Sequence, residues 1–415
     1  MEVYDSIYRV LNSIISEKMS LFSAIKKNDI CFNDKNRNRI ISFCGLYLRN
    51  YEFIKYFTSK VLNLNNAKNE IYFGIFYIDL TFKKINDVEK TTEILKEFCL
   101  NENIVLSEEN KDDFTLIIKE RRSYQLKNVK VGTYEYFSIR YNLPLWIIKM
   151  LSNQYGVTEM IKIIREMAKM PRQFVIKNNL FFEDSDEINL DNFKIVEDGI
   201  YEYLPQTSLR KEPLVRDSKL IGLQMGEYEL GKYLPDLKNK SVTCYLSKRT
   251  KDFFFILNKY YENNLINLFQ KNEKDNYSDF ILTKKKENSN IFSFTSSSDG
   301  LLAYIDRNQD LLIYYPESSS INEFRKAPDY GIIFNPSNLD DIILNQIEDL
   351  NNLACFIKKN GRLVYALDTI DLKETIIIIK KFLETHNEFT LEQEKIYFPQ
   401  EQDNSIFYWT ILKRK

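Results

Sequence analysis

The residue types that most often carry out chemistry in proteins are few and scattered in this chain. Its 415 residues include one histidine, His386, in a polar stretch that is typical of a helix end or a loop. A single histidine argues against metal sites built on histidine clusters and against Ser-His-Asp hydrolysis. The cysteines are odd in number and far apart, which predicts reduced thiols in a cytoplasmic protein: Cys31, Cys44, Cys99, Cys244 and Cys355.

The sequence also lacks the common signatures of phosphate binding and of membrane insertion. It has only 11 glycines and contains neither G-x-G-x-x-G nor G-x-x-x-x-G-K. No apolar stretch approaches the roughly 18 residues of a membrane span, and the N-terminus is not built like a signal peptide. With 58 basic and 59 acidic side chains the net charge is −1. Any RNA-binding surface would therefore be local, or its affinity for RNA modest.

The first half of the chain is predicted to be mainly helical. Apolar residues recur at helical spacing before residue 130, with a polar segment at 101–113 that predicts an exposed loop. Pro144 is expected to begin a further helix and Gly156 to end it, followed by a helix over 157–168 and a strand after Pro171. Residues 183–215 read as a loop-rich boundary. The helices expected before residue 130 cover 39–61, 70–82, 89–100 and 114–122.

The second half alternates short β-leaning runs with helical patterns. This alternation predicts an α/β domain with a mostly parallel sheet, whose edge is closed by an antiparallel hairpin at the C-terminus. The expected helices cover 250–262, 338–358 and 371–385. The expected strands cover 241–246, 264–270, 290–295, 310–315, 361–367 and 406–413.

The order of these segments resembles the Sun/RsmB family of bacterial ribosomal RNA cytosine-5 methyltransferases. The most specific match is RYNLPLWIIKMLSNQYG (140–156), which is similar to the family's R-Y-S-x-P-x-W-L-V-x-x-L-x-x-x-Y-G. Residues 34–57 and 71–78 resemble two helices of the family's first domain. Residues 323–370 resemble the stretch from R-R-N-P to L-V-Y-S-T-C-S, and 398–415 the closing hairpin. The resemblance covers nearly the whole chain.

The resemblance implies an α/β protein in three parts. These are an all-α NusB-like domain at 1–130, a small linker or RNA-binding-like domain at 131–215, and a Rossmann-like methyltransferase domain at 216–415. Members of the family transfer a methyl group from S-adenosylmethionine to cytosine C5. One cysteine thiolate adds to the ring and a second helps to release the product. Thiolate suits this step because it is polarizable and available near neutral pH.

The positions that match the two catalytic cysteines hold other residues. L-V-Y-S-T-C-S is LVYALDT here, which places Asp368 at the nucleophile position. D-A-P-C-S-G is YYPESSS, with Tyr314 at the aspartate position and Glu317 at the second cysteine, or Ser318 if the alignment slips by one. A carboxylate is a poor nucleophile for this addition. Asp368 could instead cap the helix at 371–385, a role for which Thr369 competes.

The cofactor motif departs from the family pattern as well. Its A-A-P-G-G-K-T loop, in which glycine lets the backbone approach the cofactor, corresponds to SKRTKDF (247–253) without glycine or proline. The ribose-binding acidic position falls near Gln270, and Asp299 is the plausible adenine or ribose partner. Nucleophile and cofactor motifs are thus missing together. S-adenosylmethionine is expected only if the protein is active, and otherwise no cofactor.

Candidate RNA contacts come from basic side chains and from family positions. Arg121 and Arg122, with Lys127 and Lys130, could touch phosphate, although a solvated charged face is the alternative. Trp146 is expected to pack between the linker helix and the methyltransferase domain, and Cys244 and Cys355 are expected to be inert core thiols. Asn178 matches the Asn of an R-V-N motif, while Gln224 matches the Gln of a Q-D motif whose aspartate is Met225 here. The RNA-binding candidates are Arg121, Arg122, Asn178, Arg325 and Lys326.

Three hypotheses follow for a cytoplasmic, monomeric protein that binds neither membrane nor DNA. The first is a diverged relative that keeps RNA or ribosome binding and has lost methyl transfer. The second is a working ribosomal RNA methyltransferase with rearranged residues. The third is a protein-binding scaffold without an RNA role, which the near-neutral charge favours.

Overall fold

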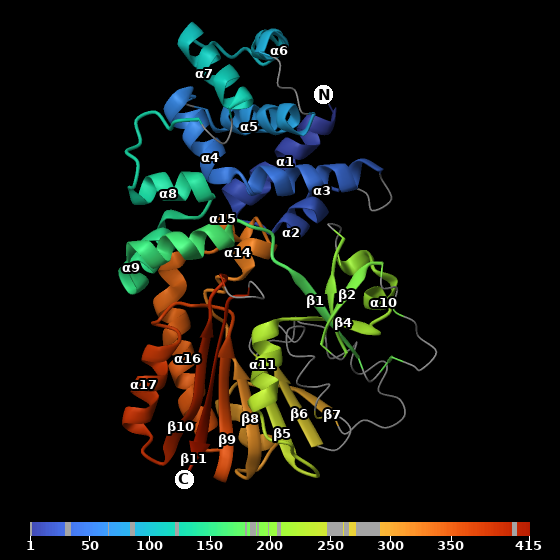
Figure 1. Cartoon of the computed structure of the whole chain (residues 1–415), viewed down its shortest axis with the longest axis vertical. Helices are drawn as coiled ribbons and strands as arrows, with labels where there is room; N and C mark the ends of the chain where they lie inside the picture. Colours follow the sequence, from blue (N-terminus) through green and yellow to red (C-terminus); the bar gives the residue numbers. More distant parts are fainter. Residues whose placement is uncertain are drawn as a thin grey trace. The chain divides into compact units, whose positions relative to one another are not determined.

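A computed structural model gives the architecture of the chain (Figure 1). Within the described part, no helix is long and apolar enough to cross a membrane. The described residues are 2–29, 35–64, 66–83, 88–120, 124–178, 181–182, 188, 191–197, 199–205, 209–246, 260, 265–270, 291–400 and 405–415.

The chain divides into two compact units. The first comprises Met1–Ala168 together with Glu323–Asn335, and the second comprises Lys169–Asn322 and Pro336–Lys415. We call them the helical unit and the sheet unit. The chain therefore leaves the sheet unit at residue 323 and returns to it at residue 336. The three-part division at residues 130 and 215 stays a prediction.

The helical unit is built on α5, whose residues from Ile71 to Leu80 are all buried. Asn66 caps this helix by accepting a hydrogen bond from the Lys68 amide at 2.8 Å. A Cβ at Gly74 would lie 2.4 Å from the Tyr47 ring, so α3 and α5 approach closely at this glycine. The elements are α1 Glu2–Glu17, α2 Leu21–Lys27, α3 Lys35–Leu48, α4 Tyr51–Tyr56, η1 Phe57–Val61, α5 Ala67–Phe82, α6 Val88–Asn101, α7 Glu108–Lys119, α8 Tyr134–Tyr141, α9 Leu145–Met167, α14 Glu323–Lys326 and α15 Tyr330–Ile333.

Two predictions for the helical unit are wrong in detail. The helix expected over 39–61 is broken after Leu48, and the chain continues as α4 and η1. The segment 101–113 is not all loop, because α7 begins at Glu108. The Ser107 hydroxyl accepts from the Asn110 amide at 3.1 Å and caps this helix. The helix break at Gly156 is confirmed, since its φ of 80° and ψ of 161° interrupt α9.

A four-stranded antiparallel sheet opens the sheet unit, in the order β2-β3-β1-β4. The strand expected after Pro171 is β1. The loop-rich reading of 183–215 is wrong for β2 and β3, whose aromatic residues Phe193, Tyr201 and Tyr203 share one apolar cluster. Gly199, at a φ of 75°, lies between these two strands. The elements are β1 Gln173–Lys177, β2 Phe193–Glu197, β3 Ile200–Tyr203, η2 Leu209–Lys211, α10 Pro213–Arg216 and β4 Leu220–Leu223.

The main sheet has seven strands in the order β10-β11-β9-β8-β5-β6-β7. From β9 to β7 neighbouring strands are parallel, whereas β11 runs antiparallel to β9 and β10. The expected mostly parallel sheet and closing hairpin are confirmed. The strands are β5 Ser241–Leu246, β6 Leu265–Gln270, β7 Ile291–Thr295, β8 Gln309–Tyr315, β9 Ile357–Leu367, β10 Phe389–Tyr397 and β11 Phe407–Arg414.

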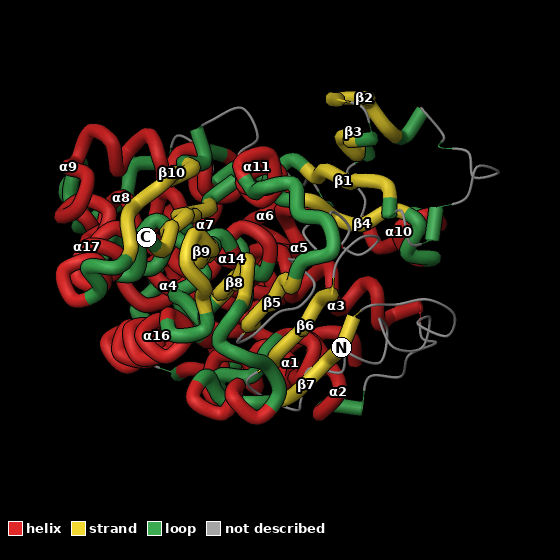
Figure 2. Tube along the Cα trace, turned by 90° about the horizontal axis from the view of Figure 1, so that it is seen from below, coloured by secondary structure: helices red, strands yellow, loops and turns green. Residues whose placement is uncertain are grey.

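Helices cover both faces of the main sheet (Figure 2). On one side lie α16 and α17, and on the other α11, where Tyr233 packs on Trp409 of β11 with ring centroids 5.3 Å apart. The expected helix at 250–262 falls outside the described residues except Tyr260. The helix expected from residue 371 begins only at residue 376. The elements are α11 Met225–Tyr233, η4 Asp299–Ala303, η5 Pro336–Asn338, α16 Leu339–Ala354 and α17 Ile376–Thr385.

Candidate functional site

The two positions that the sequence comparison assigns to catalytic cysteines lie next to each other. Strands β8 and β9 are parallel neighbours, so the segments after their carboxyl ends meet at the same edge of the sheet. Asp368 directly follows β9, and the Ser318 hydroxyl lies 3.2 Å from its Oδ1 and donates to it. Both residues are buried. Glu317 is exposed, and its carbonyl oxygen accepts from Gln346 Nε2 at 2.7 Å.

A buried carboxyl group, that of Glu374, binds the segment after β8 through hydrogen bonds. It is fully buried and accepts a hydrogen bond from the Ser319 amide at 2.7 Å and another from the Ser319 hydroxyl. The Gln346 amide donates to the same carboxylate at 3.2 Å, and Thr369 Oγ1 lies 2.8 Å from Ser319 Oγ. Burial first, and then the charge of Asp371, raise the pKa of Glu374 to about 7.

Tyr314, at the position of the family's motif aspartate, also bonds within the protein. Its hydroxyl donates to Asp349 Oδ2 at 2.9 Å, and Ser298 Oγ donates to Asp349 Oδ1 at 2.6 Å. All three side chains are buried, and Asp349 belongs to α16. Burial and the neighbouring carboxylate raise the pKa of the Tyr314 hydroxyl. Tyr314 therefore donates as a neutral phenol and supplies no carboxylate.

Together these contacts define the strand-end cluster, which links the ends of β8 and β9 to α16 and to the segment before α17. Its hydroxyl and carboxyl groups are bonded to one another, so the arrangement is suited to fixing loops rather than to attacking a substrate. The expectation that Asp368 or Thr369 caps the last long helix is wrong, because α17 begins at Ile376 with Thr375 before it. The cluster members are Ser298, Tyr314, Ser318, Ser319, Gln346, Asp349, Asp368, Thr369 and Glu374.

The described cysteines do not supply a thiol to this cluster. Cys244 lies fully buried in β5, as expected, and burial raises the pKa of its thiol to about 12. The expectation of a buried Cys355 is wrong: it is exposed after α16, and its sulfur donates to the Asn352 carbonyl oxygen at 3.2 Å. Cys44 and Cys99 belong to the helical unit. Cys31 lies outside the described residues.

The residues expected to bind a methyl donor are only partly described. Asp299 is exposed at the start of η4, and Gln270 is the last residue of β6. The expected cofactor loop 247–253 lies outside the described residues. Where the ends of β7 and β8 are described, Ser298 and Tyr314 both bond to Asp349. The hydroxyls of Ser298 and Tyr314, at these strand ends, are therefore engaged by a carboxylate of the protein.

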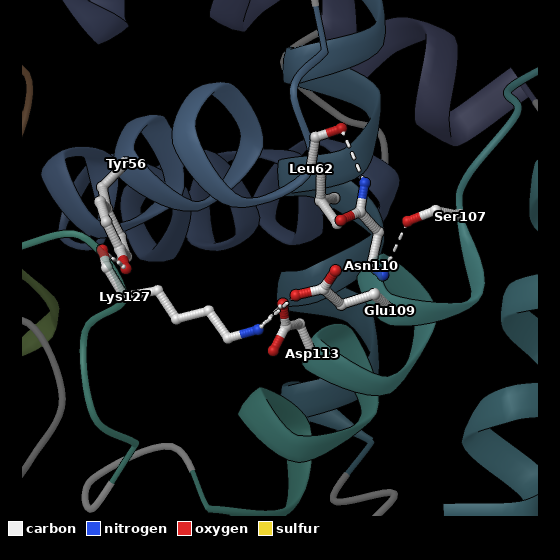
Figure 3. A network of polar contacts seen from close by, with 7 residues as sticks. All are labelled: Tyr56, Leu62, Ser107, Glu109, Asn110, Asp113 and Lys127. Carbon is white, nitrogen blue, oxygen red and sulfur yellow. Dashed lines mark hydrogen bonds and ion pairs between the residues drawn. The ribbon is translucent and has the colours of Figure 1, made fainter.

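One basic candidate for RNA binding belongs to a polar network of the helical unit (Figure 3). Lys127 Nζ lies 2.7 Å from Asp113 Oδ2 and 3.2 Å from Glu109 Oε1, and the Lys127 carbonyl oxygen accepts from the Tyr56 hydroxyl at 2.8 Å. These contacts tie the segment after α7 to α4 and α7. Arg121 and Arg122 lie outside the described residues. Lys127 is thus occupied by carboxylates of its own chain.

Two of the remaining RNA candidates are buried. Asn178 donates to the Ser218 carbonyl oxygen at 2.8 Å, which connects the end of β1 to the residues before β4. Arg325 is 2% exposed and its guanidinium donates to the Glu166 carbonyl oxygen at 3.4 Å. Its neighbour Lys326 is exposed. Among Asn178, Arg325 and Lys326, only Lys326 presents its side chain to solvent.

Sequence reasoning missed the residues that anchor the strand-end cluster. Gln346 and Asp349 lie on α16 in a face that also carries the buried Leu350 and Leu353. Two polar residues on an otherwise apolar helix face were the available signal, because such groups need partners when buried. Glu374 gave no such signal, since it stands between exposed Lys373 and the start of a helix.

Comparison with known proteins supports the fold. No protein-family model and no curated protein matches the chain in sequence. The crystal structure of PH0851 has a TM-score of 0.70 at 14% identity and covers 99% of each chain. A methyltransferase homolog protein from Pyrococcus horikoshii has a TM-score of 0.53 at 13% identity, over 69% of this chain and 100% of that one. NSun6 from Pyrococcus horikoshii, solved with SFG, has a TM-score of 0.50 at 11% sequence identity, over 65% of this chain and 97% of that one. The chain thus shares its α/β fold, with a mostly parallel central sheet, with methyltransferase structures.

Proposed function

We propose that this chain is an RNA-associated cytoplasmic protein of methyltransferase fold that does not methylate cytosine. The observation that carries the proposal is the strand-end cluster. A carboxylate, Asp368, stands where the related chemistry needs a thiolate, and it accepts a hydrogen bond from Ser318. A hard, hydrogen-bonded carboxylate is a weak nucleophile towards a pyrimidine ring. These residues therefore offer no nucleophile suited to cytosine methylation.

The buried residues around this pair support a structural role. The Ser319 amide, the Ser319 hydroxyl and Gln346 all donate to the buried Glu374. Opening this region for a nucleobase would leave buried polar groups without partners, at a cost of about 1–3 kcal/mol for each group. The cluster is therefore better suited to holding the loops closed than to admitting a substrate.

RNA association rests on the fold and on the resemblance of the motifs at 140–156 and 323–370. Lys130 and Lys326 are both exposed. Of the two, Lys326 belongs to the motif at 323–370, so we assign phosphate contact to it. The test is anisotropy of a labelled ribosomal RNA fragment with the full chain, titrated at several salt concentrations. We expect affinity to fall as salt rises, because each phosphate contact releases a counterion. We also expect Lys326→Ala to weaken binding, with Lys358→Ala on β9 as the control.

A second candidate is a protein-binding scaffold. It is favoured by the net charge of −1 and by the burial of Asn178 and Arg325, which removes two RNA candidates. The same titration separates the two. Binding that is absent, or that does not change with salt, contradicts the RNA proposal and favours the scaffold. Equilibrium dialysis with labelled S-adenosylmethionine adds the third arm, since micromolar retention would favour the enzyme hypothesis.

A further inference from the structure

The segment Glu323–Asn335, which we call the latch, leaves the sheet unit and packs as part of the helical unit. It contains α14 and α15 and joins β8 to α16 along the chain. Its residue Ile332 is 9% exposed and belongs to the same apolar core as Val10, Leu11 and Ile139. A Cβ at Gly331 would lie 3.3 Å from Pro144 Cγ, so α15 packs tightly on the start of α9.

Two polar side chains fasten the latch. The Arg325 guanidinium donates to the Glu166 carbonyl oxygen near the end of α9, while the Arg325 carbonyl oxygen accepts from Arg49 at 3.1 Å. Asp329 Oδ2 accepts from the Leu21 amide at 2.8 Å, at the first turn of α2. That amide has no partner within its own helix, so the carboxylate satisfies a group that the helix leaves open.

An aromatic group completes the contact. The Trp146 ring on α9 lies against Phe324 and Phe334 of the latch, with centroids 5.9 and 5.3 Å apart. Tyr330 packs between these two phenylalanines, 5.1 Å from one and 5.6 Å from the other. These rings are half-buried, and aromatic pairs in such contact contribute to stability. The latch is thus held by apolar packing as well as by hydrogen bonds.

The residue before the latch is fixed within the sheet unit. The Asn322 amide donates to the Asp368 carbonyl oxygen at 3.2 Å, and its side-chain amide donates to Gln224 Oε1 at 3.4 Å. Asn322 is buried. The chain therefore passes from a hydrogen-bonded position beside the strand-end cluster directly into the core of the helical unit.

We infer that the latch is an integral element of the helical unit and makes the two units unfold together. Residues 1–168 alone lack the carboxylate that bonds to Leu21, the aromatic partners of Trp146 and part of their core. Pulling the latch out of the helical unit costs that unit these contacts, and unfolding the sheet unit frees the latch at both ends. Folding of the two units is coupled through this one segment.

The chain provides a direct test, because its two tryptophans report on different units. Trp146 belongs to the helical unit and Trp409 to the sheet unit. In the full-length chain, Trp409→Phe leaves a fluorescence probe of the helical unit, and Trp146→Phe, which keeps an aromatic ring against the latch, leaves one of the sheet unit. The fluorescence midpoint of each variant is compared with the far-UV circular dichroism midpoint of the same variant. We expect denaturant transitions with coincident midpoints for the two probes, which is the mark of cooperative unfolding.

Latch substitutions should then separate the two transitions. Asp329→Ala and Ile332→Ala are expected to move the Trp146 transition to lower denaturant and leave the Trp409 transition nearer its original midpoint. Asp329→Asn, which keeps an acceptor oxygen for the Leu21 amide, should restore much of the coincidence, and Lys326→Ala should preserve it. Separate transitions in the chain with an intact latch would overturn the inference. So would latch variants whose Trp146 midpoint equals that of Lys326→Ala.

Discussion

The strand-end cluster and the latch both contain residues at motif positions of the resembled family. In the cluster these residues contact each other, whereas in the latch they have different surroundings. Asp368 and Ser318 follow adjacent parallel strands and lie 3.2 Å apart. Arg325 and Lys326 are neighbours in sequence, yet one is buried and the other exposed. Adjacent parallel strands therefore bring Asp368 and Ser318 together. In the latch, by contrast, Arg325 is buried by packing while Lys326 faces solvent. The motif alone did not indicate which residue would serve which purpose.

The largest effect expected is from removing the carboxyl group at the centre of the cluster. Glu374→Ala leaves the Ser319 amide and hydroxyl and the Gln346 amide without this acceptor, and also leaves a cavity. We expect a loss of about 3 kcal/mol in the free energy of unfolding. Asp340→Ala, an exposed carboxylate on α16, is the control and should stay within about 0.5 kcal/mol. If Glu374→Ala unfolded at the same urea concentration as the unmodified chain, the cluster would not be a structural centre.

The paired residues of the latch give the next largest contrast. Arg325→Ala removes a buried guanidinium and its packing, so we expect a loss of about 2 kcal/mol in thermal or chemical unfolding. Lys326→Ala should cost less than about 0.5 kcal/mol but should weaken RNA binding. The opposite result, a destabilising Lys326→Ala and a silent Arg325→Ala, would contradict the division between packing and solvent exposure.

The raised pKa of Glu374 predicts a pH dependence of stability. Between about pH 4.5 and 7 the folded protein keeps a proton that the unfolded chain releases, so this group's contribution is full below pH 4.5 and is lost as pH rises through 7. Asp371 lies near the carboxyl group, and the Tyr365 hydroxyl donates to the Glu374 carbonyl oxygen at 2.8 Å. Glu374→Gln should flatten this part of the profile, a change on the order of 1–3 kcal/mol. Parallel profiles of the two proteins would contradict the assignment.

The smallest effect is expected in the network around Lys127. Its partners include the exposed Glu109, and such pairs contribute about 0–1 kcal/mol. Lys127→Ala should therefore cost below about 1 kcal/mol, and the cost should shrink in high salt. Its RNA affinity should equal that of the unmodified chain, since the ammonium group is engaged by carboxylates. A clear drop in RNA affinity would move Lys127 from the structural to the binding residues.

Much of the main sheet could be predicted from the sequence because its strands are short apolar runs. Residues 241–246 were expected as a strand and form β5 without any shift. The strands β2 and β3 were missed because their residues alternate with charged ones in an acidic segment. The start of α7 was missed for a related reason: Glu108 and Glu109 look like a loop but occupy a capped first turn.

The site was less predictable, because its contacts join residues far apart in the chain. Ser319 and Glu374 are separated by 55 residues, and Tyr314 and Asp349 by 35. The sequence indicates that Asp368 follows a strand, but it does not indicate that Glu374 is buried and hydrogen-bonded to Ser319. Burial of Arg325 was equally hidden, because it depends on packing with α9, which lies far earlier in the chain.

The central claim is that the strand-end cluster is a structural centre and not a reactive one. The most direct measurement is mass spectrometry of 5-methylcytidine in ribosomal RNA incubated with the purified chain and S-adenosylmethionine, beside a reaction without protein. We predict equal amounts in the two reactions. Methylation that appears with the chain, disappears in Asp368→Ala and persists in Asp340→Ala would contradict the account.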